Sequence, residues 1–340
     1  MKVLVTGHLG YIGVEMVPVL RAAGHEVVGL DTGLFDDCDF LAPPDDVPTL
    51  RVDLRDVKIE HLKGIDAVVH LGALSNDPLG DLNPQITYDI NQHASIALAR
   101  TAKEAGVKRF LFSSSCSLYG AGSTGYLDEN AAFNPVTPYG ESKILVEQAL
   151  ASLASEDYSP TYFRNATAYG VSRRLRADIV VNSLVGHAVT TGKVLMQSDG
   201  TPWRPLVHIR DIILAFSCAL VAPKDIIHDQ AFNVGQTKEN YQIRQVAQMV
   251  AEVVPNCELS FAEGATADLR NYKVDFTKIE TKMPGYKPTW TLRQGIEELY
   301  EAYTRIGLTK EDWTGARYYR LPTIKGLLAR QKIDSQLRRT

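Results

Sequence analysis

A tyrosine and a lysine four residues apart are the side chains of this chain best suited to acid–base chemistry. Tyr139 and Lys143 stand at helical spacing, so both side chains project from one face of a helix. A free phenol has a pKa of about 10, and a neighbouring ammonium lowers that pKa by favouring the phenolate. Tyr139 can then take a proton from a substrate hydroxyl while a hydride leaves the same carbon. Taken alone, the pair also fits an exposed helix surface.

A run of hydroxyl side chains supports the chemical interpretation. The segment Ser113-Ser-Ser-Cys-Ser117 directly follows the apolar residues 110–112. In an open parallel sheet the carboxyl ends of the strands line the ligand crevice, which makes these serines candidates for that crevice. The alternative is a polar loop that caps the next helix.

A strand that runs into a glycine-spaced turn must hold the group that accepts the hydride. Residues 3–13 read VLVTGHLGYIG. Gly7 permits a tight turn, Gly10 lets the backbone approach a pyrophosphate, and Gly13 lets the next helix pack close to the strand. The helix that begins near Tyr11 points its free N–H groups at the phosphates. This order of elements predicts a dinucleotide pocket.

An acid at the end of the second strand indicates which dinucleotide binds. The apolar run 26–30 ends in Asp31, 18 residues after Gly13. A carboxylate there accepts hydrogen bonds from the adenosine ribose and repels a 2′-phosphate. The sequence therefore predicts NAD as the cofactor.

Apolar strands alternate with helical patterns through the first half of the chain. We expect strands at 2–6, 26–30, 49–52, 66–71, 109–113 and 160–164, and helices at 11–23, 91–106 and 139–154. This rhythm predicts an α/β fold with a Rossmann-type doubly wound parallel sheet. Beyond residue 168, helical patterns at 178–191, 209–221 and 240–253 alternate with short strands. They predict a smaller C-terminal substrate-binding lobe.

Composition narrows the class of protein. The chain has 340 residues, 45% of them hydrophobic, and a net charge of −4, so we expect a sizeable core and no nucleic-acid or membrane partner. The four cysteines lack metal-type spacing and are typical of reduced thiols. We expect His70 and His208 to make local hydrogen bonds, with no metal site. The first strand at Lys2 leaves no room for a signal peptide, so we expect a cytoplasmic protein.

Several segments, in order along residues 1–300, resemble the extended short-chain dehydrogenase/reductases, in their nucleotide-sugar epimerase and dehydratase group. They are residues 6–13 (TGHLGYIG), 52–56 (VDLRD), 70–73 (HLGA), Asn91, the serine run, Tyr139-x-x-x-Lys143, 164–170 (RNATAYG), 204–208 (RPLVH) with Asp211, and 231–235 (AFNVG). The resemblance implies an NAD-dependent enzyme that acts on a nucleotide-diphosphate sugar. It also implies a homodimer joined by a four-helix bundle of helices 91–106 and 139–154.

The resemblance assigns roles to single residues. Ser115 donates a hydrogen bond to the reacting oxygen, Tyr139 is the base, and Lys143 holds the nicotinamide ribose. The cofactor is contacted by Gly7, Leu9, Gly10, Tyr11, Ile12, Gly13, Asp31, Asp53, Leu54, Leu71, Gly72, Ala73, Asn91, Ser113, Tyr139, Lys143 and Asn165. The substrate is contacted by Ser75, Asp77, Ser115, Ser117, Thr167, Asn182, Ser183, Arg204 and Arg270. The two arginines suit a diphosphate, although both could be ordinary surface arginines, and Asp77 could be only a turn residue before Pro78.

Departures from the group's pattern bear on the reaction. Cys116 and Ser117 stand where 4,6-dehydratases of the group have an Asp-Glu pair, and decarboxylases usually keep the glutamate. A small polar residue there resembles the 4-epimerases, so we predict C4 epimerisation through a transient 4-keto sugar. The alternatives are decarboxylation of a nucleotide-linked hexuronate, reduction or dehydration of a keto sugar, and a non-catalytic NAD-binding sensor. Thr167 replaces an asparagine common in relatives, so the sugar and the base are not predicted.

The organisation of the chain follows from these assignments. We expect residues 1–167 to be mainly the NAD-binding domain and residues 168–300 mainly the nucleotide-sugar-binding lobe. Residues 301–340 lie outside the resemblance. Trp313 and the run 318–322 suggest a packed aromatic segment, and 325–332 reads as a short basic amphipathic helix. We expect this extension to pack on the body or on a dimer partner, and a membrane-surface helix is the minor alternative.

Overall fold

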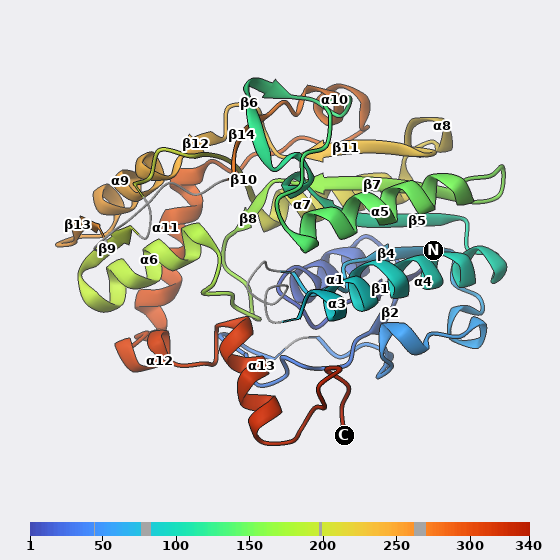
Figure 1. The fold of residues 1–340 in the computed structure, drawn as a ribbon, viewed down its shortest axis with the longest axis horizontal. Helices are drawn as coiled ribbons and strands as arrows, with labels where there is room; N and C mark the ends of the chain where they lie inside the picture. The colour runs from blue at the N-terminus through green and yellow to red at the C-terminus, as the bar shows by residue number, and fades with distance from the viewer. Residues whose placement is uncertain (44, 76–82, 197–198, 262–269) are drawn as a thin grey trace.

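Seven parallel strands form the central sheet, in the order β11-β7-β5-β4-β1-β2-β3 (Figure 1). The computed structural model describes the chain except residues 44, 76–82, 197–198 and 262–269, and gives only the backbone of 122–124, 195 and 261. The strands are β1 (Lys2–Thr6), β2 (Glu26–Leu30), β3 (Thr49–Leu50), β4 (Ala67–His70), β5 (Arg109–Ser115), β7 (Ser159–Asn165) and β11 (Gln230–Val234). Their runs are apolar because both faces of a parallel sheet are covered.

Alternate residues of each strand reach the two faces of this sheet. Val3 and Val5 belong to the cluster that packs on α1 (Gly13–Ala22) and α7 (Ile209–Val221). Leu4 belongs to the cluster of α4 (Ser95–Glu104) and α5 (Pro138–Leu153) on the opposite face. The predicted doubly wound α/β fold is confirmed.

The helix expected at 91–106 begins earlier. α3 (Pro84–Thr87) continues through a π-helical segment, η3 (Tyr88–Ala94), into α4. The side chain of Asn83 accepts a hydrogen bond from the Gln85 N–H at 3.1 Å, and Pro84 occupies the first turn. An asparagine cap followed by proline is a strong helix start.

The second lobe has its own hydrophobic core, built from helices and short strands. Its helices are α6 (Val180–Thr191), α9 (Ile243–Val253), α11 (Leu292–Ile306) and α12 (Lys310–Thr314). Its sheets pair β12 (Asn240–Gln242), β10 (Trp203–His208) and β8 (Thr167–Tyr169), and separately β13 (Glu258–Phe261) with β9 (Lys193–Met196). β6 (Ala121–Leu127) pairs with β14 (Asn271–Val274). The remaining short pieces are η1 (Leu54–Asp56), η2 (Ile59–Leu62), η4 (Cys116–Tyr119), α8 (Lys224–Ile227) and α10 (Thr277–Lys282).

Two parts of the chain cross the expected boundaries. β11 and α7 lie within residues 168–300 and yet belong to the main sheet and its helical cover. In the extension, α13 (Arg320–Ala329) buries Ile324 and Leu327 against Leu74 and Ile86. The apolar face of this helix is therefore covered by the body of the protein.

Candidate active site

The first turn of α5 fixes the Tyr139–Lys143 pair. Thr137 caps the helix by accepting a hydrogen bond from the Gly140 N–H at 3.2 Å, and Pro138 follows at the first helical position. The Lys143 Nζ donates to the Ser113 carbonyl at 2.7 Å and lies 5.4 Å from the centre of the Tyr139 ring. Burial lowers the pKa of Lys143 to about 7, and the charge of Glu147 only partly offsets this.

A buried ion pair holds this helix against the sheet. Glu147, one turn after Lys143 on α5, pairs with Arg164 of β7 at 2.7 Å, and both side chains are only 6% exposed. Glu147 also accepts a hydrogen bond from the Ser114 hydroxyl of β5 at 2.5 Å. Arg164 donates further to the Tyr119 hydroxyl at 3.1 Å. The two contacts of Glu147 hold α5 against the carboxyl ends of β5 and β7.

The serine run divides between the cavity and the core. Ser113, Ser115 and Ser117 line the main cavity and are partly exposed, whereas Ser114 and Cys116 are buried, although Ser114 still contributes to the cavity wall. This is the alternation expected of an extended strand that continues into a turn. The Ser115 Oγ accepts a hydrogen bond from the Ser117 N–H at 3.1 Å, which leaves its own proton available to a substrate oxygen.

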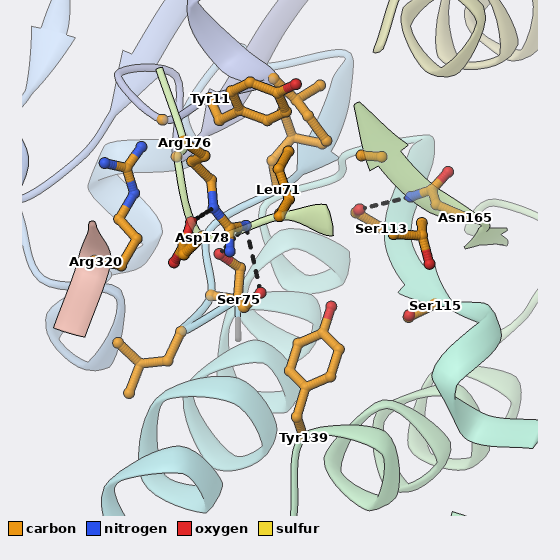
Figure 2. A pocket seen from close by; sticks show the side chains of 18 of the residues that line it. Tyr11, Leu71, Ser75, Ser113, Ser115, Tyr139, Asn165, Arg176, Asp178 and Arg320 are labelled. Carbon is orange, nitrogen blue, oxygen red and sulfur yellow. Dashed lines mark hydrogen bonds and ion pairs between the residues drawn. The ribbon is translucent and has the colours of Figure 1, made fainter. Parts of the chain in front are cut away.

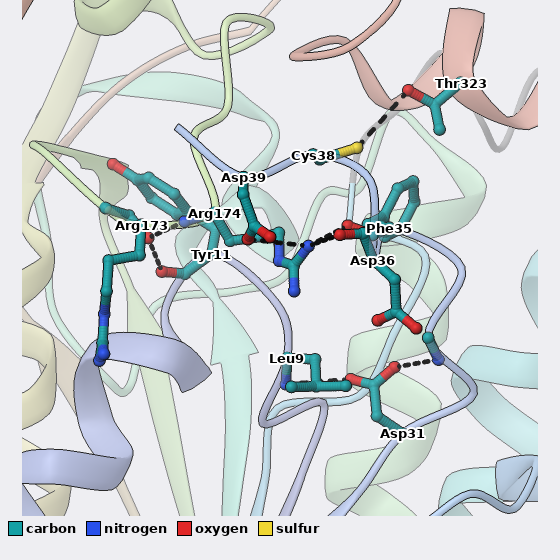
Figure 3. Close-up of polar contacts among 12 residues, drawn as sticks. Leu9, Tyr11, Asp31, Phe35, Asp36, Cys38, Asp39, Arg173, Arg174 and Thr323 are labelled. Carbon is teal, nitrogen blue, oxygen red and sulfur yellow. Dashed lines mark hydrogen bonds and ion pairs between the residues drawn. The ribbon is translucent and has the colours of Figure 1, made fainter. Parts of the chain in front are cut away.

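The glycine turn is tightly packed. Gly7 has a φ of +70°, and a methyl group added there would lie 2.9 Å from the Gly72 Cα. A methyl group on Gly13 would lie 2.3 Å from the Gly7 carbonyl oxygen. Asp31 accepts hydrogen bonds from the Leu9 N–H at 3.2 Å and the Gly33 N–H at 2.8 Å (Figure 3). Strand, turn and acid thus form one unit at the end of β1 and β2.

His70 supports the neighbouring turn. Its Nδ1 lies 2.6 Å from the Thr6 Oγ1 and its Nε2 lies 2.8 Å from the Ser95 Oγ. The Thr6 Oγ1 accepts a hydrogen bond from the Gly72 N–H at 3.1 Å. Burial lowers the pKa of His70 to about 3, so the imidazole is neutral near pH 7.

A single cavity of about 970 Å³ runs along the carboxyl ends of these strands. Its wall contains most of the predicted residues: Gly7, Gly10, Tyr11, Ile12, Gly13, Asp31, Asp53, Leu54, Leu71, Gly72, Ala73, Ser75, Ser113, Ser115, Ser117, Tyr139, Lys143, Asn165, Thr167, Ser183, Arg204 and Arg270. Leu9 is not in the wall and contributes through its bond to Asp31. Asp77 lies outside the described residues.

Two residues predicted to contact ligands, Asn91 and Asn182, bond to the backbone and lie outside the cavity wall. Asn91 is buried, and its amide exchanges hydrogen bonds with the N–H and carbonyl of Leu74 at 2.8 and 2.9 Å. Asn182 is fully buried, accepts from the Gly170 N–H at 3.1 Å and donates to the Arg176 carbonyl at 3.0 Å. Neither lines the cavity, because both amides are turned toward the backbone loops that shape it. The cofactor contact of Asn91 and the substrate contact of Asn182 stay predictions.

The two arginines expected at a diphosphate lie together. Arg204 on β10 and Arg270 before β14 both line the cavity, and an Arg204 N–H donates to the Arg270 carbonyl oxygen. The Arg204 guanidinium lies 5.7 Å from the centre of the Tyr272 ring. Residues 66 positions apart thus form one basic end of the cavity.

The lining residues that the sequence analysis did not assign to the site include Arg176, Asp178, Tyr319, Arg320 and Leu337. A signal existed for the first two, because the basic run 173–176 comes shortly after a strand, at the end where the crevice lies. The other three belong to the C-terminal extension, and no local pattern predicts the path of that segment.

The last residues of the extension cover the far end of the cavity. Arg55, beside the lining residue Asp53, donates to the Gln336 carbonyl at 2.9 Å, and Arg338 pairs with Asp56. Arg339 donates to the Thr32 carbonyl at 2.7 Å. Between these contacts the buried side chain of Leu337 forms part of the wall. We call residues 336–339 the strap.

The sequence around this site matches the model of a known protein family. Residues 3–235 match the model described as the NAD dependent epimerase/dehydratase family. This chain belongs to that family. The resemblance and the NAD cofactor predicted from the sequence are confirmed at that level, and the family consists of enzymes acting on sugars.

Relatives and solved structures agree with the family model. The chain is 30% identical to the UDP-glucose 4-epimerase of Lactobacillus helveticus over 85% of this chain and 92% of that protein. It is also 30% identical to the UDP-glucose 4-epimerase of Corynebacterium glutamicum, over 74% and 80%. Among solved structures, MoeE5 in complex with UDP-glucuronic acid and NAD has a TM-score of 0.79 and 26% identity, covering 90% of this chain and 99% of that one.

The residues present fit NAD. The glycines form a cradle that side chains would fill, at the N-terminus of α1 where phosphates bind. In the described part of the wall, the Asn165 Oδ1 and the Ser117 Oγ are buried polar atoms without a hydrogen-bond partner. Such atoms cost free energy unless a ligand supplies the missing bond, so the wall is adapted to a polar ligand.

The described residues contain no group of three or more His, Cys, Asp or Glu side chains placed to hold a metal ion. Within the same residues, no helix combines the length and the apolarity that a membrane span needs.

Proposed function

We propose that this protein is a nucleotide-diphosphate-sugar epimerase that inverts C4 through a transient 4-keto sugar. The proposal rests on the family, on the two UDP-glucose 4-epimerases to which the chain is similar, and on the Ser115, Tyr139 and Lys143 constellation in one cavity. The nucleotide and the sugar are left open.

The chain's own residues divide the work at C4. NAD, when bound, supplies the hydride acceptor and donor. Tyr139 takes the proton of the C4 hydroxyl, and Ser115 donates a hydrogen bond to the same oxygen, which becomes the ketone oxygen. Lys143 stabilises the phenolate of Tyr139 through its charge. Once the sugar presents its other face, the hydride held on the cofactor would return to C4 and Tyr139 gives the proton back to the oxygen, so no net oxidation occurs.

The observation that most supports C4 epimerisation is that the two residues after Ser115, Cys116 and Ser117, are not acidic. Cys116 points into the core, where its Sγ donates to the Arg164 carbonyl at 3.1 Å. Burial raises the pKa of this thiol well above its usual range, so Cys116 stays neutral. Ser117 brings only a hydroxyl to the cavity. Residues so arranged suit reversible oxidation at C4 and lack the neighbouring acid and base that eliminate water.

Proton NMR in D₂O tests the proposal. The purified protein, without added NAD, is given UDP-, GDP-, CDP-, ADP- and dTDP-hexoses and UDP-glucuronate in separate tubes. A C4 epimer without deuterium at C4 supports internal hydride return. Deuterium incorporation or loss of the carboxylate would indicate other 4-keto chemistry, and silence would indicate a sensor or an untested sugar; each outcome rejects C4 epimerisation of the sugars tried.

Matched tyrosine variants make the test specific to the site. Tyr139→Phe removes the base and should lower turnover by about 10²–10⁴-fold while the protein keeps its NAD. Tyr88→Phe removes a hydroxyl of the same kind outside the cavity, where it donates to Glu141 at 2.7 Å. Equal turnover in the two variants would contradict the role of Tyr139.

The homodimer belongs to the same proposal. Helices α4 and α5 lie side by side on one face of the sheet, the pair that we expect to meet its copy in a four-helix bundle (Figure 1). Light scattering at micromolar concentration should give twice the mass of the 37.5 kDa chain. A monomer mass would refute this assembly.

A further inference from the structure

The C-terminal extension brings a buried arginine to the wall of the cavity. Arg320, the first residue of α13, is 3% exposed and lines the cavity together with Tyr319. It lies beyond residues 3–235, the part that the family model matches. Figure 2 shows it beside Arg176 and Asp178. An extension to the matched region therefore contributes a charge to the site.

The contacts of the buried Arg320 guanidinium are with a carbonyl and an aromatic ring, which carry no full negative charge. Its Nη2 donates to the Arg174 carbonyl at 3.3 Å, and its centre lies 4.3 Å from the Phe35 ring. The Nη1 is buried and has no hydrogen-bond partner in the described part of the chain. Arg320 also forms no ion pair with any described carboxylate that the structure records.

The neighbouring arginines, Arg174 and Arg176, each form an ion pair with a carboxylate. Arg174 pairs with Asp39 at 3.1 Å and donates to the carbonyls of Phe35 and Asp36 (Figure 3). Arg176 pairs with Asp178 at 2.9 Å and donates to the Ser75 hydroxyl at 3.0 Å. Burial, together with the positive charge of Arg176, lowers the pKa of Arg320 to about 10.

A buried charge without a partner costs free energy unless a ligand supplies the opposite charge. We propose that Arg320 and Arg176 form an oxyanion subsite that takes a phosphate or carboxylate group of a bound ligand. A planar guanidinium suits both groups, because its parallel N–H bonds match two oxygens. The proposed function supplies two sources for this anion: a phosphate of the cofactor, or an acidic group on the sugar.

The other anion sites already expected in the cavity lie elsewhere. The N-terminus of α1 suits the pyrophosphate of the dinucleotide, and Arg204 with Arg270 suits the diphosphate of the substrate. On the cofactor source, Arg320 and Arg176 would share the pyrophosphate of NAD with the N-terminus of α1, because NAD has no other phosphate. On the acidic-sugar source the subsite is additional to both sites and would select substrates by charge. The inference rests on the proposed function only for the identity of the ligands.

Calorimetric titration of Arg320→Met distinguishes the two sources. If a cofactor phosphate occupies the subsite, the NAD-free variant binds NAD at least tenfold more weakly than wild type and binds adenosine within twofold. If an acidic sugar occupies it, the NAD-loaded variant loses at least tenfold in affinity for UDP-glucuronate and stays within twofold for UDP-glucose. Both readouts are binding constants, so they are independent of whether a C4 epimer forms.

A matched variant separates ligand binding from folding. Arg174→Met removes a buried arginine whose charge is paired with Asp39, although its Nε has no hydrogen-bond partner among the described residues, so it should lower the unfolding midpoint of the ligand-free protein. Arg320→Met should leave that midpoint unchanged or raise it, because it removes an uncompensated charge. Arg320→Lys keeps the charge, loses the fork and should weaken binding by a smaller factor, and it serves if Arg320→Met does not fold.

Two results would overturn the subsite. One is an Arg320→Met protein that binds NAD within twofold of wild type and separates the two UDP-sugars no differently from wild type. The other is an Arg320→Met protein destabilised as much as Arg174→Met, with its affinities unchanged, since that would make Arg320 a purely structural residue.

Discussion

Replacing Glu147 by glutamine should lower both the free energy of unfolding of the protein and the pKa of Lys143. The substitution keeps the size of the side chain and removes the carboxylate of Glu147 that pairs with Arg164, where both side chains are 6% exposed. Breaking a buried ion pair on one side leaves an uncompensated charge and costs about 3–5 kcal/mol. Urea unfolding at pH 7 measures this loss directly.

The same change alters the titration of Lys143. Burial lowers the pKa of this ammonium to about 7 and Glu147 raises it, so removing the carboxylate lowers the pKa further. At a fixed pH the variant then holds less of the charged form that stabilises the Tyr139 phenolate. The alkaline fall of turnover should therefore begin at a lower pH in Glu147→Gln than in wild type.

Two controls make the result decisive. Glu141→Gln removes an exposed carboxylate of the same helix, whose partner is the Tyr88 hydroxyl, and should cost less than about 1 kcal/mol. Glu147→Leu combined with Arg164→Met removes both charges and should recover most of the lost stability. The reasoning is refuted if Glu147→Gln unfolds within about 1 kcal/mol of wild type.

Two further perturbations test the cofactor end of the cavity. Gly13→Ala places a methyl group 2.3 Å from the Gly7 carbonyl oxygen and should abolish retention of NAD, measured by absorbance after denaturation. Gly326→Ala, whose methyl group would have no atom nearer than the Arg330 Nη2 at 4.0 Å, should retain the cofactor; equal retention would contradict the packing argument. The pKa of His70 is lowered by burial from 6.5 to about 3, so the neutral ring favours the folded state above pH 6.5 and this contribution is lost as the pH falls. Relative to His70→Asn, wild type should lose about 2 kcal/mol of unfolding free energy between pH 7 and pH 5, and parallel pH profiles would refute the assignment.

Much of the site could be predicted because its signals are local. The strand, the glycine turn and Asp31 follow each other within the first 31 residues. Gly7 and Gly13 stand where a larger side chain would clash with nearby backbone. Tyr139 and Lys143 are linked by helical spacing, and strand alternation explains why Ser115 reaches the cavity whereas Cys116 does not.

The rest of the site depends on contacts between distant parts of the chain. Asn91 and Asn182 are polar residues near the crevice in sequence, but only the folded backbone shows that their amides are used by Leu74 and Gly170. Arg320 reaches the cavity because α13 packs on Leu74 and Ile86, and its own sequence carries no sign of that docking. Tertiary packing, and not propensity, placed these side chains.

Because of the strap, the N-terminal NAD-binding region of this protein cannot be moved into a relative without the C-terminal extension that contacts it. Arg339 and Thr32 are 307 positions apart and are joined by a hydrogen bond. Leu337, between the strap's anchors at Asp56 and Thr32, forms one cavity wall with Thr32. A chimera that takes residues 1–167 from this chain and the remainder from a relative would inherit the glycine turn without the segment that covers it. A working chimera therefore has to exchange the first 60 residues and residues 319–339 together, because direct contacts join the two segments in the wall of the cavity.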